Sequence, residues 1–442
     1  MKKLFSLLAA PLLISPLWAA DLMQIYREAR DSDAAYAAAR FNLDAGRERT
    51  PQARAGLLPT LSVGANSVWN ENDLYLRNNS STYNTKFNSN GYTLTLSQPL
   101  FRWQNWVAYD QSKFQVAQAE AVFVQASQDL ILRVSQAYFD VLFAKENLKA
   151  VRANKISIEQ QLESAKRNFE VGTSTIVDSQ EAQARFDLAT AQEIAAENDV
   201  EVRQRTLQAI IGKEPGALAP FRRDAQIVPP QPADMKQWAS AAEKDNISVQ
   251  IQEATLEIAT REVDRQRAGH YPTIDLVANK GSSTAFASTA GGMLETDFQN
   301  IGVQLNLPIF QGGLVVSRQS EASANRASAE ATLEQARRNA ALLARQHYLG
   351  ATNGLAQVRA LKAALISSQS SLESNRLGFE VGVRINIDVL NADNQVYVTR
   401  RDLARAVVDT LMSQLRLKAA VNTLSEDDVA AINALLDAQA TE

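Results

Sequence analysis

Apolar residues recur at helical spacing over a long stretch without proline, residues 101–214. In its first part the spacing alternates between four and three residues, and only one position of this seam is polar. The seam runs through Leu130, Val134, Ala137, Val141, Ala144, Leu148, Val151, Lys155, Ile158, Leu162, Ala165 and Phe169. A period of about 3.5 residues predicts a helix that coils left-handedly around a partner helix. A second proline-free stretch, 309–442, has a weaker seam because it carries His347, Gly354, Ser368 and Asn375.

Glycines mark the ends of both long helices. At 1.5 Å per residue, a helix over 101–171 would be roughly 100 Å long. Gly172 can end it, because glycine accepts the left-handed conformation that follows a helix, and one of the next three Ser and Thr residues can cap the following helix. Gly382 and Asn386 hold similar positions in the second stretch. Two long helical hairpins with tight tips are therefore predicted, over residues 102–212 and 311–422.

Four shorter segments alternate apolar and polar residues, which is the period of a strand with one apolar face. Strands are expected over about 58–70, 90–101, 271–287 and 297–310. The polar stretches 70–90 and 280–296 are suited to water-facing loops between the members of each pair. Alternation by itself does not exclude a small soluble antiparallel sheet that has one buried face, which is the less favoured alternative.

The whole pattern occurs twice, about 210 residues apart. Phe169-Glu170-Val171-Gly172 returns as Phe379-Glu380-Val381-Gly382, and Gln98-Pro99-Leu100-Phe101 has its counterpart in Leu307-Pro308-Ile309-Phe310. The sequence thus predicts two equivalent halves, each with a helix, two strands and a hairpin, the two helices covering about 21–55 and 234–268. The expected divisions are a first repeat over 21–212, a connector over 213–233, a second repeat over 234–422 and a C-terminal segment over 423–442.

The first twenty residues predict an export signal. Lys2 and Lys3 precede an apolar stretch, 4–17, and Ala19 and Ala20 are small residues suited to a cleavage site. Cleavage after either alanine stays open. The other interpretation, a membrane anchor, is disfavoured because the stretch is shorter than the roughly 20 residues that a spanning helix needs.

The composition excludes several classes of site. The net charge is −4, which gives no electrostatic footprint for nucleic acid. There is no cysteine and there are only two histidines, so thiolate metal sites, cysteine nucleophiles and histidine clusters are ruled out or disfavoured. No phosphate-binding glycine loop or nucleophile elbow is present. We therefore expect no catalysis, no cofactor and no metal.

Strand number limits how this chain could enter a membrane. No segment after the export signal resembles a membrane-spanning helix, so contact with the hydrocarbon would have to be made by strands. The smallest known membrane barrels have about eight strands, and each chain offers four. A barrel would therefore need more than one chain.

These features together resemble the TolC family of outer-membrane efflux and type I secretion channels. The resemblance rests on the repeat, on strand pairs that close at Pro99 and Pro308, and on the Val-Gly turns. It also rests on two runs, Val381-Gly382-Val383-Arg384-Ile385-Asn386-Ile387-Asp388-Val389-Leu390 and Phe310-Gln311-Gly312-Gly313. The implied fold class is an α+β membrane protein, a homotrimer whose twelve-stranded outer-membrane β-barrel continues into a periplasmic α-helical barrel.

The resemblance also implies a function and partners. The expected function is a passive exit duct for drugs or secreted proteins. Its expected partners are an inner-membrane transporter, a periplasmic adaptor protein and outer-membrane lipid. The main alternative is a soluble periplasmic coiled-coil adaptor, which would share the long hairpins but would not need two amphipathic strand pairs.

The family closes its periplasmic aperture with polar links near the hairpin tips. By this resemblance, Asp178 and Arg384 are the linking pair and Asp388 belongs to an acidic ring. Phe379 replaces a tyrosine of the best-known members and removes a hydrogen bond to Asp178, while Asn391 replaces a frequent second aspartate. Without the resemblance, such charges are ordinary solvated residues near helix starts, where aspartate favours the helix dipole.

Both Val-Gly turns are candidates for adaptor docking. The resemblance implies that Val171 and Gly172, and likewise Val381 and Gly382, receive the tip of the adaptor's own hairpin. The turn alone also explains the glycines. Aromatic residues near the strand ends are expected either in a membrane-interface girdle or in a buried core: Trp69, Tyr92, Phe101, Trp103 and Trp106.

Overall fold

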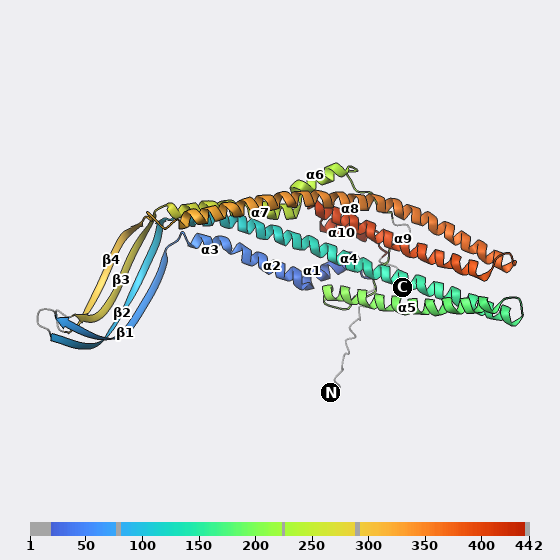
Figure 1. Cartoon of the computed structure of the whole chain (residues 1–442), viewed down its shortest axis with the longest axis horizontal. Helices are drawn as coiled ribbons and strands as arrows, with labels where there is room; N and C mark the ends of the chain where they lie inside the picture. The colour runs from blue at the N-terminus through green and yellow to red at the C-terminus, as the bar shows by residue number, and fades with distance from the viewer. Residues whose placement is uncertain (1–18, 77–80, 223–225, 288–291, 438–442) are drawn as a thin grey trace, which may run out of the picture. The chain divides into compact units, whose positions relative to one another are not determined.

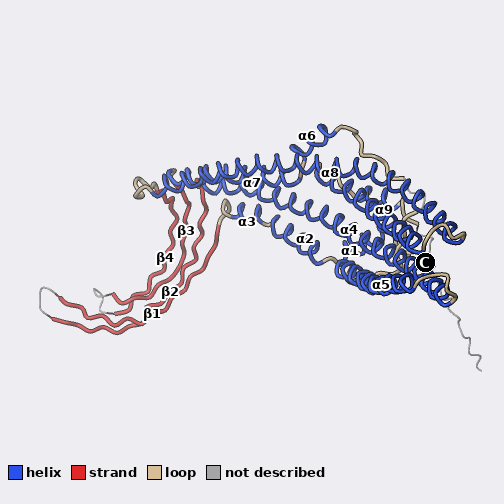
Figure 2. Tube along the Cα trace, turned by 45° about the vertical axis from the view of Figure 1, so that its right-hand side comes forward, coloured by secondary structure: helices blue, strands red, loops and turns tan. Residues whose placement is uncertain are grey.

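A computed structural model describes residues 19–76, 81–222, 226–287 and 292–437. Two similar sets of elements follow one another along the chain, each with short helices, a pair of strands and two long helices (Figures 1 and 2). The first set is α1 (Leu22–Ser32), α2 (Ala34–Arg47), α3 (Arg49–Ala55), β1 (Thr60–Leu76), β2 (Ser81–Phe101), α4 (Trp103–Glu170) and α5 (Ile176–Ile211). The second set is α6 (Met235–Asp245), α7 (Ile247–Arg267), η1 (Ala268–His270), β3 (Thr273–Ala287), β4 (Gly292–Asn306), α8 (Leu314–Glu380), α9 (Asn386–Ala420) and α10 (Glu426–Asn433).

The chain divides into two compact units. The first unit comprises Met1–Ala39, Val124–Ile247 and Arg338–Glu442, and its described part contains both hairpin tips. The second comprises Arg40–Phe123 and Ser248–Arg337, and contains the strands. Within the described ranges, no helix is both long enough and apolar enough to cross a membrane.

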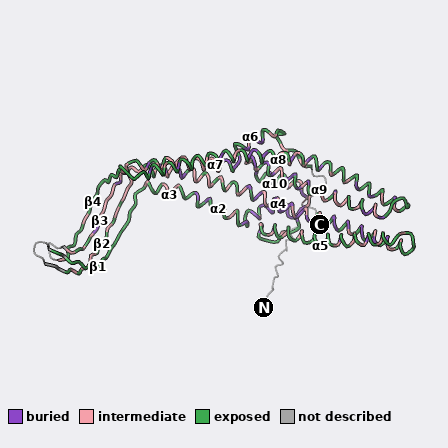
Figure 3. Tube along the Cα trace, viewed as in Figure 1, coloured by how far each residue is buried: buried purple, intermediate pink, exposed green. Residues whose placement is uncertain are grey.

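The strands of the second unit form one antiparallel sheet in the order β1-β2-β3-β4. The pairing Leu61↔Leu96↔Ala278↔Ile301 places apolar residues of all four strands on one face. Thr95 and Asn279 lie on the opposite face, where their side chains are joined by a hydrogen bond of 2.8 Å. The predicted alternation is therefore present. Figure 3 draws most of the sheet as exposed or intermediate.

The predicted loops 70–90 and 280–296 are largely strand, and that part of the prediction was wrong. β1 continues to Leu76, β2 begins at Ser81 and β4 begins at Gly292. β3 ends at Ala287, which is the end predicted for that strand. Polar residues pair across these extensions: Glu71 faces Lys86 with an ion pair of 2.6 Å, and Asn84 donates to Asp73 at 2.8 Å. Cross-strand polar pairs of this kind stabilise a ladder without apolar alternation.

The last predicted strand begins and ends earlier along the chain than expected. β4 ends at Asn306, four residues before the predicted end at 310. Pro308, two residues further on, cannot donate to a ladder, which limits the strand there.

One short helix was expected before each strand pair, and both of these helices are interrupted. Asp33 adopts an extended conformation between α1 and α2, and its carboxylate accepts the Tyr36 N–H at 2.7 Å. The same carboxylate lies 3.0 Å from the Arg133 guanidinium. Asn246 breaks the second helix in the same way, and its side chain donates to the Ala420 carbonyl at 2.8 Å. Both breaks are fixed by partners far along the chain, which local propensity does not reveal.

The heptad seam of α4 packs as predicted in the first unit. Most of its members are buried, among them Leu130, Val134, Ala137, Val141, Ala144, Val151, Ile158, Leu162 and Ala165. Alanines at heptad spacing on α5, Ala182 and Ala189, pack against this seam together with Phe186. Lys155, the one polar member, is neutralised by Glu193 at 2.8 Å.

Small residues take the place of a strong seam between α8 and α9. A side-chain carbon at Gly350 would lie 2.9 Å from the Ser413 hydroxyl, so glycine lets the two helices approach closely. Gly354 meets Thr410 in the same manner, one helical turn away. His347 lies partly buried in this seam, and burial followed by the charge of Arg416 lowers its pKa. The weak apolar pattern of the second stretch is thus explained by close backbone packing.

Candidate functional site

The first hairpin tip is a turn of five residues between α4 and α5. Gly172 has φ +78°, the left-handed region, and its N–H donates to the Phe169 carbonyl at 3.0 Å. The Thr173 N–H donates to Asn168 at 2.8 Å. These two bonds form the Schellman motif that ends a helix at glycine. The predicted role of this glycine in the turn is confirmed.

The second tip repeats this geometry. Gly382 also has φ +78°, and its N–H donates to Phe379 at 3.1 Å. The Val383 N–H donates to Gly378 at 2.9 Å. The valine before each glycine is exposed, 73% for Val171 and 65% for Val381. Each tip therefore presents apolar side chains to solvent beside a glycine that leaves the backbone accessible.

Asp178 closes a capping box at the start of α5. Its carboxylate accepts the Thr175 hydroxyl at 2.7 Å and the Thr175 N–H at 2.9 Å. The Thr175 hydroxyl in turn accepts the Asp178 N–H. Hydrogen bonds from Thr175 and then from Ser174 lower the pKa of the Asp178 carboxyl, so it is ionised at neutral pH. This carboxylate stabilises the first turn of α5.

Arg384 and Asp388 form an ion pair at the start of α9. Their closest atoms are 3.7 Å apart, and the Arg384 side chain is 58% exposed. Arg384 also packs over Gly378, because a side-chain carbon at Gly378 would lie 2.7 Å from its Cγ. Ile385 occupies the N-cap position and offers no side-chain hydrogen bond. The second tip is therefore held by one exposed ion pair where the first has a capping box.

The structure does not bring Asp178 and Arg384 together within the described chain. Asp178 is engaged by its own cap, and Arg384 by Asp388. Phe379 is half-buried and has no hydroxyl to offer. Asn391 accepts a hydrogen bond from Arg185 of α5 at 3.1 Å, which joins the two hairpins.

One group near the tips was not identified from the sequence. Arg376 of α8 donates to the Ser157 hydroxyl of α4 at 2.9 Å, and the same nitrogen lies 3.4 Å from Asp393 of α9. The Asp393 side chain is only 12% exposed. Burial raises the pKa of this carboxyl, opposed by the Ser157 hydrogen bond and by the charges of Arg376 and Arg400. In the sequence, Asp393 follows Asn386 and Leu390 at spacings of four and three residues. This heptad spacing could have indicated that Asp393 faces a neighbouring helix.

The apolar face of the sheet is a second candidate site. Its side chains are exposed, 73% for Val63 and 74% for Ile301. Trp69, Trp103 and Trp106 are also exposed, so the alternative of a buried aromatic core is wrong for them. Contiguous apolar surface of this kind marks a site of contact with a membrane or a partner.

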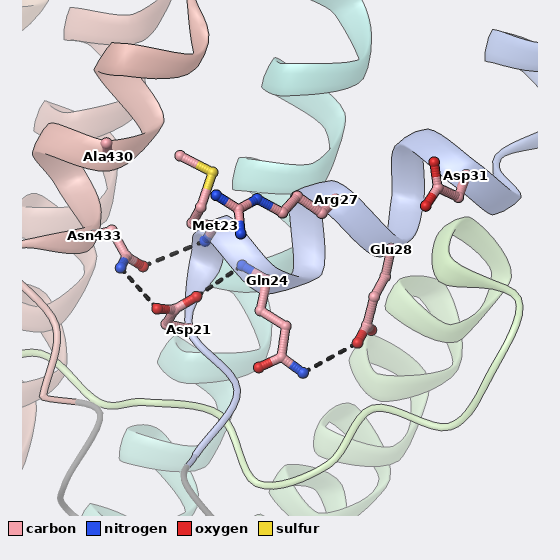
Figure 4. Close-up of a pocket in the computed structure, with 8 residues that line it drawn as sticks. All are labelled: Asp21, Met23, Gln24, Arg27, Glu28, Asp31, Ala430 and Asn433. Carbon is pink, nitrogen blue, oxygen red and sulfur yellow. Dashed lines mark hydrogen bonds between the residues drawn. The ribbon is translucent and has the colours of Figure 1, made fainter.

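Hydrogen bonds join α1 to α10 beside an open groove (Figure 4). Its volume is about 610 Å³, and polar side chains dominate its lining. Asn433 donates to the Asp21 carboxylate at 2.9 Å and accepts the Met23 N–H at 3.3 Å. Among the described residues, no three acidic, histidine or cysteine side chains come together to hold a metal.

Comparison with known proteins points to one family. A model of the family described as outer membrane efflux protein matches residues 25–213 and again 238–423. The outer membrane protein TolC of Vibrio cholerae is 33% identical over 440 residues, 98% of this chain and 98% of that protein. The proteases secretion protein PrtF of Dickeya chrysanthemi is 30% identical over 419 residues, which cover 93% of this chain and 90% of that protein. The crystal structure of the CmeC outer membrane channel of Campylobacter jejuni has the same fold, with a TM-score of 0.80 at 17% identity over 94% of this chain and 90% of that one.

Proposed function

Because the chain belongs to the family of outer membrane efflux proteins, we propose that it is an outer-membrane exit duct. It serves a tripartite efflux pump or a type I secretion system, and conducts drugs or secreted proteins passively. Relatives named for the outer membrane and for protease secretion support both uses. The transporter and the periplasmic adaptor that dock on the duct select the cargo, and the duct itself performs no catalysis.

The observation that carries this proposal is an open-edged sheet with one apolar face. Within the described chain, β1 and β4 each have a strand partner on one side only. A lipid-exposed edge is not tolerated in a membrane, because its N–H and C=O groups would lack partners. Pairing of β4 with β1 of another chain would satisfy both edges. Three chains would then give a twelve-stranded barrel, apolar outside and polar inside.

Further assignments follow from the tips and from the chain ends. The aperture at the periplasmic end is formed by the tip residues Asp178, Phe379, Arg384, Asp388 and Asn391. The exposed turns at Val171-Gly172 and Val381-Gly382 receive the adaptor. The connector 213–233 and the C-terminal segment 423–442 form an equatorial region, a proposal supported by the antiparallel bridge between Phe221 and Leu436.

Purification from the outer membrane in mild detergent tests the proposal. We expect heat-resistant trimers on semi-native gels and discrete single-channel currents in planar bilayers. Monomers that fractionate with the soluble periplasm and give no current would contradict the duct and favour a periplasmic adaptor.

A further inference from the structure

The second hairpin packs on the first through a set of side chains that we call the hairpin seam. On α9 the seam comprises Asn386, Leu390, Asp393 and Tyr397, which follow one another at spacings of four, three and four. On α4 it comprises Asn154, Ser157, Ile158 and Gln161, which share one helix face. Leu390 packs against Ile158 and against Ala189 of α5, which fixes the orientation of α9.

This seam is more polar than the nearby packing of α4 on α5, where Leu162, Ala165 and Ala182 form an apolar cluster. Four side-chain oxygens in it are buried without a hydrogen-bond partner: Asn154 Oδ1, Gln161 Oε1, Asn386 Oδ1 and Asp393 Oδ2. Buried polar atoms without partners destabilise a packed interface, and a group of them calls for an explanation. Such atoms gain water when the interface parts, so the seam opposes opening less than an apolar seam would.

Arg376 is a charged group that crosses the seam. One guanidinium nitrogen reaches Ser157 of α4 at 2.9 Å and Asp393 of α9 at 3.4 Å. It therefore ties both helices of the second hairpin to the first. The charges that act on Asp393 are those of Arg376 and of Arg400, which lies about two turns further along the same helix.

We propose that Arg376 is a latch that holds the second hairpin against the first, with Ser157 and Asp393 as the groups it grips. The proposal rests on the duct function and adds a positioning residue to it, about one helical turn before the second tip. Breaking the latch lets the polar seam take up water and separate, which widens the periplasmic end.

Single-channel conductance in planar bilayers tests the latch. Arg376→Ala should raise the ratio of open to closed duct about fivefold per chain, the factor that corresponds to about 1 kcal/mol. Ser157→Ala is a second, smaller change and should act in the same direction. Arg376→Asp combined with Asp393→Arg should return the ratio toward that of the unmodified chain, because the ion pair is restored with its charges exchanged. A role in folding alone does not predict this rescue.

Controls separate the latch from the duct function. Arg205→Ala removes an arginine of similar exposure that pairs within α5 with Glu201 at 2.7 Å, and it should leave conductance unchanged. Trimers and currents of the unmodified chain are measured first, and their absence would count against the duct function. With currents present, unchanged gating in both Arg376→Ala and Ser157→Ala would overturn the latch, as would additive effects in the charge-exchanged pair.

A separate observation concerns Ala20, one of two residues after which the export signal could be cut. Ala20 forms a parallel bridge with Leu218. Its N–H donates to Ala217 at 2.7 Å, and its carbonyl accepts the Ala219 N–H at 3.1 Å. The buried Tyr138 hydroxyl lies 3.2 Å from the same carbonyl oxygen. Ala20 is therefore an integral part of the folded first unit.

Asp21 is anchored just as firmly on the other side of this bridge. Its carboxylate caps α1 by accepting the Gln24 N–H at 2.7 Å, and Asn433 donates to it, as Figure 4 shows. A cut after Ala20 would remove the bridge and leave a free ammonium group at the cap, beside the positive end of the helix dipole. A cut after Ala19 keeps both.

We infer that signal peptidase cuts between Ala19 and Ala20, so that the mature chain begins Ala-Asp-Leu-Met. Terminal sequencing of protein purified from the outer membrane tests this directly. A mature chain that begins Asp-Leu-Met-Gln would overturn it. Deletion of Ala20 behind the same signal should lower the thermal midpoint of the mature protein, and an unchanged midpoint would contradict the structural argument.

Discussion

Asp178 and Asp388 occupy equivalent positions, the third residue of the helix after each hairpin tip, but their carboxylates have different partners. Asp178 accepts two hydrogen bonds from the N-cap residue Thr175. Asp388 has Ile385 at its N-cap and turns instead to Arg384, 3.7 Å away. At the first tip the carboxylate is therefore hydrogen-bonded within its own turn. At the second tip it forms an exposed ion pair, whose charged groups can bind water instead.

This difference predicts which tip controls the aperture. Arg384→Ala or Asp388→Ala should raise single-channel conductance or change its cation selectivity in planar bilayers. Each change removes an exposed ion pair that contributes about 0–1 kcal/mol per chain. Arg205→Ala is the control, since it removes an exposed ion pair within α5 that lies outside the aperture. Unchanged conductance and selectivity in both second-tip variants would remove them from the gate.

The caps can be exchanged between the tips. Thr175→Ala should destabilise the first turn of α5 by about 1 kcal/mol, because the N-cap hydroxyl is lost. Ile385→Thr should stabilise the first turn of α9 by a similar amount, because it places a hydroxyl at an N-cap that lacks one. Amide hydrogen exchange in the two first turns measures both effects. Faster exchange in α5 with slower exchange in α9 is expected, and no difference in either helix would contradict the cap assignment.

The sequence predicts the parts of this fold that local pattern determines. The seam of α4 was visible because apolar residues recur over many turns, and its polar member Lys155 finds Glu193 at the matching level of α5. Both turn glycines could be predicted, because a positive φ restricts the choice of residue. The roles of the tip residues in gating and docking stay predictions.

Long-range partners set the features that the sequence did not reveal. The break at Asp33 depends on Arg133, a hundred residues away, and that at Asn246 depends on the Ala420 carbonyl. The polar extensions of the strands depend on register, since Glu71 indicates a strand only when Lys86 is known to face it. Arg376 reaches across three helices, and no spacing within one helix encodes such a contact.

The Asp33–Arg133 pair predicts an acid-sensitive first unit. The hydrogen bond from Arg133, opposed by burial, lowers the pKa of the Asp33 carboxyl below its unfolded value of about 3.9. The pair therefore stabilises the folded chain above that pH, and this stability is lost as the pH falls from about 3.9 through the folded pKa.

Arg133→Met should reduce this loss of folding stability at acid pH. It should also lower the free energy of unfolding at neutral pH by about 2 kcal/mol, because a buried carboxylate loses its charged donor. Thermal unfolding at several pH values between about 2.5 and 7 measures both effects. Arg205→Met is the matched control, since its partner Glu201 is exposed. If stability falls at acid pH to the same extent in Arg133→Met, other carboxyl groups and not Asp33 determine the acid sensitivity.

Two neighbouring residues of β1 provide the sharpest test of the sheet. Val63 lies on the apolar face opposite Leu94, and Ser62 lies on the polar face opposite Thr95. Val63→Lys should place a charge against hydrocarbon, which costs about 2–4 kcal/mol near the middle of a bilayer, and should reduce the heat-resistant trimer recovered from the outer membrane. Ser62→Lys places the same charge one residue away, toward the water-filled interior, and should assemble normally while altering ion selectivity. Equal recovery of both variants would mean that the apolar face does not contact lipid, and with it the membrane assignment of this sheet would fail.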